Sequence, residues 1–334
     1  MAEESISETP LSLRLDPETG EHDAGLSAFA KVRPRLFGIA YRMLGSAAEA
    51  EDIVQDVWVR WQSTNRSGVQ NPPAFMVKTT TRLCINLAQS APARREIYVG
   101  TWLPEPVDTS DDPGLGAERG EALNLAVLVL LEKLTPRERA AYVLREAFDY
   151  SFREIADILH IEEENTRQLV SRARKHITDS RRTPVSPDQH RRFLEAFIGA
   201  AQKGDMAALE GLFTEDVVSY SDGGGIVRAA RVPVSGRERV AHFIAVASHF
   251  WTGVTHAWVE TNGQASVLIS RDGEPTALVT VDASAQGIDQ IMWIMRPSKL
   301  AAISKSGKKW DEVVRDSRQL SKPTIAPANN PRHP

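Results

Sequence analysis

Apolar residues recur at helical spacing in two separate stretches of the chain. Residues 26–90 carry apolar positions three and four apart, with one break at residues 65–73 (NRSGVQNPP). Helical spacing returns at residues 121–180. Between the two lie residues 99–116 (VGTWLPEPVDTSDDPGLG), which are dense in proline, glycine and aspartate, as is typical of a linker. The pattern therefore predicts two all-helical units joined by an irregular segment.

The last large segment has a different pattern. It follows a second hinge at residues 181–190 (RRTPVSPDQH) and begins with a helix that we expect to end at Gly204. Short β-rich runs follow, with turn pairs at Asn262-Gly263 and Asp272-Gly273 that are typical of hairpins. A further helix is expected within residues 236–251. We predict an α+β unit.

A cationic helix is predicted at residues 164–177 (ENTRQLVSRARKHI). One face is mostly apolar, with Thr166, Leu169, Val170, Ala173 and Ile177 at helical spacing. The opposite face carries Arg167, Gln168, Ser171, Arg172, Arg174 and Lys175. A short amphipathic helix at residues 151–161 precedes it after a brief turn, as in a helix-turn-helix whose second helix enters the major groove of DNA. The alternative is an ordinary helical hairpin with a solvated basic face.

Two features of the first stretch suggest partners. Ser46 and Glu49 form a capping-box pattern, like Thr135 and Glu138 later in the chain. The helix that follows Ser46 should bury an apolar stripe and expose a polar, acidic strip of Glu51, Asp52, Gln55 and Asp56, which suits a basic protein surface or is merely solvated. Residues 71–86 mix aromatic, hydroxyl and arginine side chains, a combination that suits unpaired bases.

The composition limits which partners and which kinds of site the chain can have. The formal net charge is -4, with 42% hydrophobic and 25% charged residues, so any DNA binding must come from a local patch. One cysteine, Cys84, excludes an internal disulfide framework and fits a reducing cytoplasm. Residues 123–134, the longest apolar run, are too short to span a bilayer, so we expect no membrane partner and a cytoplasmic location. No His, Asp or Glu spacing indicates a metal site, and no cofactor is expected.

The order of these segments resembles a known family. AYRMLGSAAEAEDIVQDVWVRW, PPAFMVKTTTRLCINL and LTPRERAAYVLREAFDYSFREIADIL with TRQLVSRARKHI resemble the bacterial RNA polymerase sigma factors of the extracytoplasmic-function (ECF) class. TWLPEP and DGGG resemble the subgroup with a C-terminal SnoaL-like extension of NTF2-like fold. In this chain, Ile226 stands where the subgroup has lysine after the glycines, and RPSKL replaces its NPDKL.

The resemblance implies a multidomain chain, with two all-α sigma domains followed by an α+β cone-shaped domain. The implied ranges are a disordered acidic tail (1–25), sigma domain 2 (26–100), a linker (101–120), sigma domain 4 with the helix-turn-helix (121–182), a SnoaL-like regulatory domain (187–305) and a flexible tail (306–334). The implied function is promoter-specific transcription initiation with core RNA polymerase, without enzymatic activity.

The resemblance also implies site residues. Core polymerase would bind Glu51, Asp52, Gln55 and Asp56. The melted −10 element would be captured by Phe75, Lys78, Thr79, Arg82 and Asn86. The duplex −35 element would be read by Asn165, Thr166, Arg167, Gln168, Ser171, Arg172, Arg174 and Lys175.

The C-terminal domain has two interpretations. As a regulator it would pack on the linker and would replace a separate anti-sigma protein. The regulatory residues implied are Trp102 and Leu103 of the linker and Asp222, Gly223, Gly224 and Gly225 of the C-terminal domain. A small ligand in its cone is a further possibility. The alternative is a helix-turn-helix regulator fused to a ketosteroid-isomerase-like enzyme or a ligand-binding domain, with acid–base candidates among Asp222, His242, His249 and His256.

Overall fold

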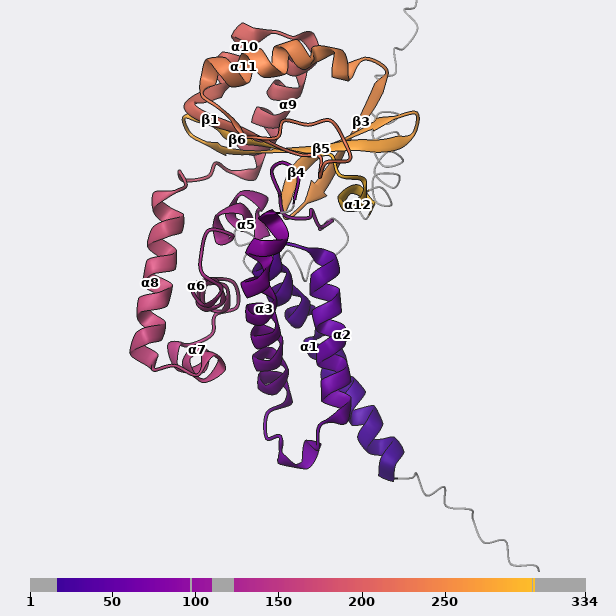
Figure 1. Cartoon of the computed structure of the whole chain (residues 1–334), viewed down its shortest axis with the longest axis vertical. Helices are drawn as coiled ribbons and strands as arrows, with labels where there is room; N and C mark the ends of the chain where they lie inside the picture. Colours follow the sequence, from indigo (N-terminus) through magenta and orange to yellow (C-terminus); the bar gives the residue numbers. More distant parts are fainter. Residues whose placement is uncertain (1–16, 97, 110–122, 302, 304–334) are drawn as a thin grey trace, which may run out of the picture.

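The molecule has three folded units that pack on one another. The computed structural model describes residues 17–96, 98–109, 123–301 and 303; the expected tail at 306–334 lies outside them. In Figure 1 a sheet lies across one end of two helical units, with further helices on the far side of the sheet. The described part of the linker, residues 98–109, runs between the sheet and the helices.

The first helical unit consists of three long helices and one short turn. Its elements are α1 (Pro17–Leu44), α2 (Ala47–Ser63), the 3-10 turn η1 (Arg66–Gly68) and α3 (Pro72–Glu96). The predicted stripe of α2 is buried at Ile53, Val54, Val57 and Trp61. The disordered tail expected at 1–25 is wrong for residues 17–25, because α1 begins at Pro17; residues 1–16 lie outside the described residues.

The second helical unit is made of short helices and one long one. Its elements are α5 (Leu125–Leu131), α6 (Pro136–Tyr142), the π turn η3 (Val143–Ala147), α7 (Phe152–Leu159) and α8 (Glu163–Asp179). The capping box of Thr135 and Glu138 forms as predicted. The helix α7 is capped by His160 in the left-handed conformation (φ 52°), and α8 begins three residues after His160.

The C-terminal unit is an α+β fold, as predicted. Its helical elements are α9 (Pro187–Lys203), α10 (Met206–Leu212), α11 (Arg237–Val246), the 3-10 turn η4 (Ala247–Trp251) and α12 (Pro297–Leu300). Its strands are β1 (Phe213–Asp222), β2 (Val234–Ser235), β3 (Val254–Thr261), β4 (Gln264–Arg271), β5 (Glu274–Ser284) and β6 (Gly287–Ile294). They form one sheet in the order β2-β1-β6-β5-β4-β3, in which β1 and β6 are parallel.

Local signals for this unit are confirmed. Gly204 ends α9 in the left-handed conformation. Asn262-Gly263 and Asp272-Gly273 all have positive φ angles, as a type I′ hairpin turn requires, and they join β3 to β4 and β4 to β5. Strands joined by two-residue turns must be antiparallel neighbours, which explains the order at this edge of the sheet.

Both faces of the sheet are buried, against different partners. Because side chains alternate along a strand, Val267 and Ile269 pack with α9 and α11, whereas Leu268 packs with the two helical units. The core that Leu268 shares with the helical units also contains Val259, Leu278, Met292 and Ile294 of the strands, and Leu300 and Ile303 after the sheet. The three units are therefore held together by one continuous apolar core.

Candidate functional site

The basic face of α8 is exposed. The side chains of Asn165, Arg167, Gln168, Ser171, Arg172, Arg174 and Lys175 are all exposed. The opposite face is buried at Thr166, Val170, Ala173 and Ile177, so the stripe predicted from the sequence is the packed side. The helix α8 lies on the outer side of the molecule (Figure 1), so its exposed basic face is open to an anionic partner.

Thr166 does not belong to this exposed face. It is 0% exposed, and its hydroxyl group donates to the carbonyl oxygen of Glu162 at 3.3 Å. The helical period that places Arg167 outside turns the neighbouring Thr166 toward the core. Our expectation that Thr166 contacts DNA is therefore wrong.

Three arginines of the exposed face pair with acids of their own unit. Arg174 lies 2.7 Å from Glu146, Arg172 lies 3.4 Å from Glu138, and Arg167 pairs with Glu163. All three guanidinium groups are about half exposed or more, so each pair is worth only about 0–1 kcal/mol. Such weak pairs can be exchanged for phosphate or base contacts at little cost.

The acidic strip of α2 is also exposed. Glu51, Asp52, Gln55 and Asp56 lie on the solvent side of the helix, opposite its buried stripe. Glu51 is paired with Arg33 of α1 at 2.7 Å. The strip therefore presents acidic side chains on a rigid, packed helix.

The side chains expected to contact unpaired bases differ in their solvent exposure. Arg82 and Asn86 are exposed, whereas Phe75, Lys78 and Thr79 are half-buried. The Phe75 ring packs against Trp61 with centroids 5.8 Å apart, and the Thr79 hydroxyl group donates to the Phe75 carbonyl oxygen at 2.8 Å.

One end of the helix-turn-helix lies against α3. The helices α6 and α7 both contact α3. Desolvation lowers the pKa of His160, in the turn between α7 and α8, and the nearby charges of Arg82 and Lys78 on α3 lower it further. The helical unit that carries the surface expected to read the −35 element therefore packs, through α6 and α7, on the helix expected to capture the −10 element.

Buried polar contacts join the two helical units. Arg139 of α6 donates to the Met43 carbonyl oxygen at 2.7 Å and pairs with Glu132 at 2.8 Å. Burial lowers the pKa of Arg139 to about 10. Arg42 of α1 lies over the Phe148 ring at 5.1 Å. These contacts fix the second helical unit on the first.

Asp222 lies at the centre of a site that holds the linker. It is 0% exposed and stands at the end of β1, where its carboxylate is 2.7 Å from the ammonium group of Lys299 of α12. The Leu103 backbone N–H donates to the same carboxylate at 3.0 Å, and the Tyr98 hydroxyl group donates to its other oxygen. We refer to Tyr98, Trp102, Leu103, Asp222 and Lys299 as the linker clamp.

Lys299 completes the clamp from the other side. Its ammonium group also donates to the Leu103 carbonyl oxygen and lies over the Trp102 ring at 4.6 Å. Burial lowers its pKa, and the adjacent Asp222 opposes that shift. Burial and the bond to Asp222 raise the pKa of Tyr98 to about 12. Leu103 is thus held through both backbone groups.

The linker also grips the first helical unit. Glu105 accepts from the backbone N–H groups of Ala47 and Ala48 and from the Ser46 hydroxyl group, at 2.9, 3.4 and 3.1 Å. A carboxylate at this helix terminus satisfies free N–H groups and complements the helix dipole. The Ser46 hydroxyl group still caps Glu49, but Glu105, not Glu49, completes the terminus.

A second contact ties the linker to the hairpin at Asn262. Asn262 and Val107 exchange two hydrogen bonds, at 2.9 and 3.0 Å. The Asn262 amide group also donates to the Tyr41 hydroxyl oxygen at 2.7 Å and to the Leu123 carbonyl oxygen at 2.9 Å. One turn residue therefore contacts both helical units and the linker.

Two of the three glycines after Asp222 let the linker approach closely. A β-carbon on Gly225 would lie 2.9 Å from Val99, and one on Gly224 would lie 3.0 Å from the Tyr98 hydroxyl oxygen. Ile226, which follows them, is 68% exposed. The buried lysine of this site comes from RPSKL instead, as Lys299.

The sequence reasoning found Trp102, Leu103, Asp222 and the glycines but missed their partners. The missed residues of the linker site are Tyr41, Tyr98, Glu105, Asn262 and Lys299. A signal existed for Lys299, since RPSKL keeps the lysine of the motif it resembles. None existed for Asn262, whose turn role alone was predicted.

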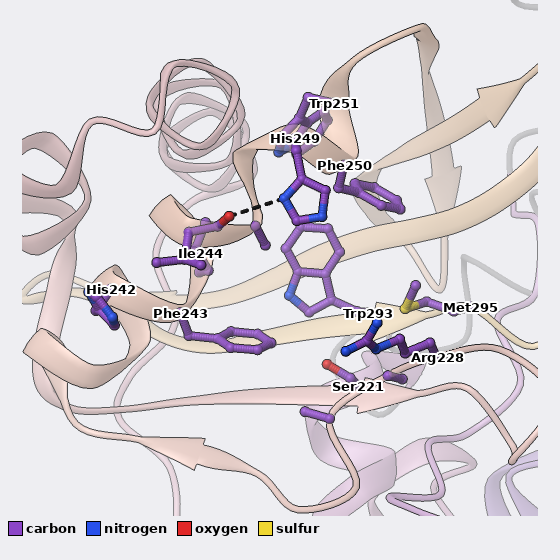
Figure 2. Close-up of a pocket in the computed structure, with 14 residues that line it drawn as sticks. Ser221, Arg228, His242, Phe243, Ile244, His249, Phe250, Trp251, Trp293 and Met295 are labelled. Carbon is purple, nitrogen blue, oxygen red and sulfur yellow. Dashed lines mark hydrogen bonds between the residues drawn. The ribbon is translucent and has the colours of Figure 1, made fainter.

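The cone of the C-terminal unit contains a cavity of about 640 Å³ on the far face of the sheet. Figure 2 shows Trp293 at the centre of its lining, with Phe243 and Phe250 near it and His242 at the edge. His242 and His249 are exposed, and His249 bonds to the Val246 carbonyl oxygen at 3.1 Å. His256 and Asp222 are not among the residues that line it.

The described part of the chain contains no group of three or more His, Cys, Asp or Glu side chains that could hold a metal ion. Among its helices, none combines the length and the apolar character needed to cross a membrane.

Comparison with known proteins shows which family regions the two helical units match. Residues 28–92 match the family model "Sigma-70 region 2", and residues 124–177 match "Sigma-70, region 4". The ECF RNA polymerase sigma factor SigJ of Mycobacterium tuberculosis is 37% identical over 225 residues, or 66% of this chain and 72% of that protein. The probable ECF sigma factor SigI of the same organism is 30% identical over 84% of this chain and 96% of its own.

A solved structure extends the likeness to the C-terminal unit. The crystal structure of M. tuberculosis SigJ superposes with a TM-score of 0.67 at 30% identity, covering 83% of this chain and 98% of that one. The match therefore includes the sheet as well as the helices. Both helical regions, the relatives and the shared architecture lead to one conclusion: the chain belongs to the family of ECF RNA polymerase sigma factors and directs promoter-specific transcription.

Proposed function

We propose that the C-terminal unit regulates this sigma factor by stabilising a closed arrangement of its two promoter-reading units. In this proposal α8 reads the −35 element, α3 captures the −10 element, and the acidic strip of α2 binds core polymerase. The protein needs no separate anti-sigma factor, acts in the cytoplasm and has no catalytic activity of its own. The single observation that carries the proposal is the contact between α3 and the helix-turn-helix.

That contact is incompatible with reading both elements together. The −10 and −35 elements are about 25 base pairs apart by their names, or about 85 Å along a duplex at about 3.4 Å per base pair. Because α8 is packed on α6 and α7, and these contact α3, α3 and α8 cannot reach sites so far apart while the contact persists. The second helical unit must therefore leave the first before a promoter is bound at both elements.

The linker site opposes that separation. Through Asp222 and Lys299 the C-terminal unit holds Leu103, and through Asn262 it holds Val107 together with Tyr41 of the first unit. At the other end, Arg181 after α8 pairs with the buried Asp282 at 2.8 Å. The C-terminal unit thus contacts the chain both before and after the second helical unit.

The expected consequence is a lower apparent affinity for polymerase. When only an open fraction of the molecules is competent to bind, the apparent dissociation constant rises by the inverse of that fraction. A change that weakens the closed arrangement but leaves α2, α3 and α8 intact should therefore increase binding to core polymerase.

The test is Asp222→Asn in the full chain. We expect tighter binding of core polymerase and more transcript from a supercoiled promoter template at limiting sigma factor. Asp216→Asn is the matched control, because Asp216 also forms an ion pair, in this case with Arg182, but its side chain is two-thirds exposed. If Asp222→Asn and the control bind polymerase equally, the C-terminal unit does not restrain the closed arrangement in this way.

A further inference from the structure

We propose that the cone cavity binds a flat, apolar molecule with one negative charge, and that its occupancy acts on the linker clamp through β1. The binding site goes beyond the proposed function. Only its effect on the linker rests on that function.

The walls of the cavity are aromatic. Trp251 and Phe250 meet Trp293 edge-on, with centroids 6.3 Å apart in each case, and Phe243 is partly exposed at the rim. Edge-to-face rings leave flat faces and slots between them that favour an aromatic guest, which gains from ring contact as well as from burial. A cavity of about 640 Å³ is large enough for a small polycyclic molecule.

The polar groups at the cavity favour an anion. Arg228 lines it and has no ion-pair partner among the residues that the structure describes. No Asp or Glu is among the described residues that line the cavity. The Trp293 indole N–H lacks a hydrogen-bond partner although this residue is only 8% exposed. Figure 2 shows this nitrogen on the side of the ring that faces Phe243. A guest that accepts hydrogen bonds and carries a negative charge would satisfy both groups.

The cavity and the linker clamp share one strand. Ser221 lines the cavity and pairs with Trp293 of β6, whereas the next residue, Asp222, pairs with Ile294 and holds the linker. Successive residues of a strand face opposite sides, so one strand end presents a side chain to each site. The loop that follows supplies Arg228 to the cavity and Gly225 to the contact with Val99.

The same loop therefore connects both sites. A guest that draws Arg228 toward the cavity shifts the segment on which Tyr98 and Val99 rest. Occupancy of the cone would in this way alter how tightly residues 98–103 are held.

The binding test uses 2-naphthoate as the probe, with neutral 2-naphthamide as its matched analogue, measured by titration calorimetry on the full chain. We expect the carboxylate to bind at least about tenfold more tightly than the amide, and Arg228→Gln to remove that advantage. Arg239→Gln on α11 is the control, because Arg239 is exposed and does not line the cavity. The proposed site would be overturned if neither compound bound, or if both bound equally well. It would also be overturned if Arg228→Gln and Arg239→Gln reduced the advantage of the carboxylate equally.

The coupling test uses amide hydrogen exchange at residues 98–105 with saturating 2-naphthoate. We expect exchange there to change in the normal chain and to stay constant in Arg228→Gln. Binding without any change at the linker would overturn the coupling but keep the site. The proposed regulation would then still be judged by Asp222→Asn, which needs no ligand.

Discussion

The carboxylate of Asp222 and the ammonium group of Lys299 lie 2.7 Å apart and enclose the backbone of Leu103 between them. Both side chains come from the C-terminal unit, whereas Leu103 belongs to the linker between the two promoter-reading units. The pair is almost fully buried, so each charge depends on the other for its stability. A local ion pair thus links the C-terminal unit to the segment that must move in the proposed opening.

Removing one charge of this pair should destabilise the folded chain. Asp222→Asn leaves Lys299 buried without its counter-charge, a situation that costs about 3 kcal/mol or more. Chemical denaturation should show this loss, and hydrogen exchange should increase first at residues 98–105. Asp216→Asn should cost less than about 1 kcal/mol, because the Asp216 side chain is two-thirds exposed to solvent. If the two variants lost similar amounts of stability, the buried pair would contribute no more than an exposed pair.

Gly45→Ala should separate the linker from the first helical unit. Gly45 has φ of +68°, and an added β-carbon would lie 2.7 Å from the Trp102 ring. The backbone strain alone costs roughly 1–2 kcal/mol. Gly68→Ala is the control, because a β-carbon there meets nothing within 4 Å. Trp102→Ala should change the free energy of unfolding less in the Gly45→Ala variant than in the normal chain. If Trp102→Ala had the same effect in both backgrounds, the contact between Gly45 and Trp102 would be ruled out.

Sequence patterns predicted the elements well where the cause is local. The capping box at Thr135, the left-handed stop at Gly204 and the turn at Asn262-Gly263 depend on residues within a few positions of one another. The buried stripe of α8 follows from the helical period alone. The same period could have excluded Thr166 from the DNA face, since it adjoins Val170 on the packed side.

The linker site could be predicted only in part. Trp102 and Leu103 stand out as apolar residues in a polar segment, and the resemblance pointed to Asp222. The contacts of Glu105 with Ala47 and of Asn262 with Tyr41 join positions far apart in the chain. No periodicity or spacing encodes such pairs, because they arise from how whole units pack.

The basic face of α8 should separate base contacts from phosphate contacts. Gln168→Ala should weaken promoter binding by the polymerase complex by about 1–3 kcal/mol and relax the choice of base at one position. Lys175→Ala should weaken binding to all promoters alike and lower the salt dependence by about one counterion. Arg192→Ala on α9, which is exposed in the C-terminal unit, serves as the control. Promoter-binding assays at several salt concentrations would contradict the assignment if all three variants behaved alike.

The acidic strip of α2 should bind polymerase rather than support the fold. Asp52→Arg reverses one exposed charge and should reduce the affinity for core polymerase while leaving the melting temperature within about a degree or two. Glu195→Arg makes the same change on the exposed side of α9. A pull-down or anisotropy titration should distinguish the two, and equal affinities would remove Asp52 from the interface.

Stability should fall on the acid side through His190. This residue is buried, it bonds to the Val281 carbonyl oxygen at 2.9 Å, and burial lowers its pKa below 6.5. Between 6.5 and that lower pKa the unfolded chain binds more protons, so the free energy of unfolding decreases as the pH falls through this window. His190→Gln should flatten this part of the pH profile. A profile that keeps its slope would assign the effect to other groups.

The most direct test is the distance between α3 and α7 in the free protein and in its complex with core polymerase. Cysteines at Gln89 and Asp157, both exposed, can carry probes for energy transfer or spin-label measurements, because Cys84 is buried. We predict one short distance in the free chain, a partial shift to long distances in Asp222→Asn, and a long distance throughout in the polymerase complex with promoter DNA. A short distance that persists in that complex would contradict the proposed separation of the two helical units.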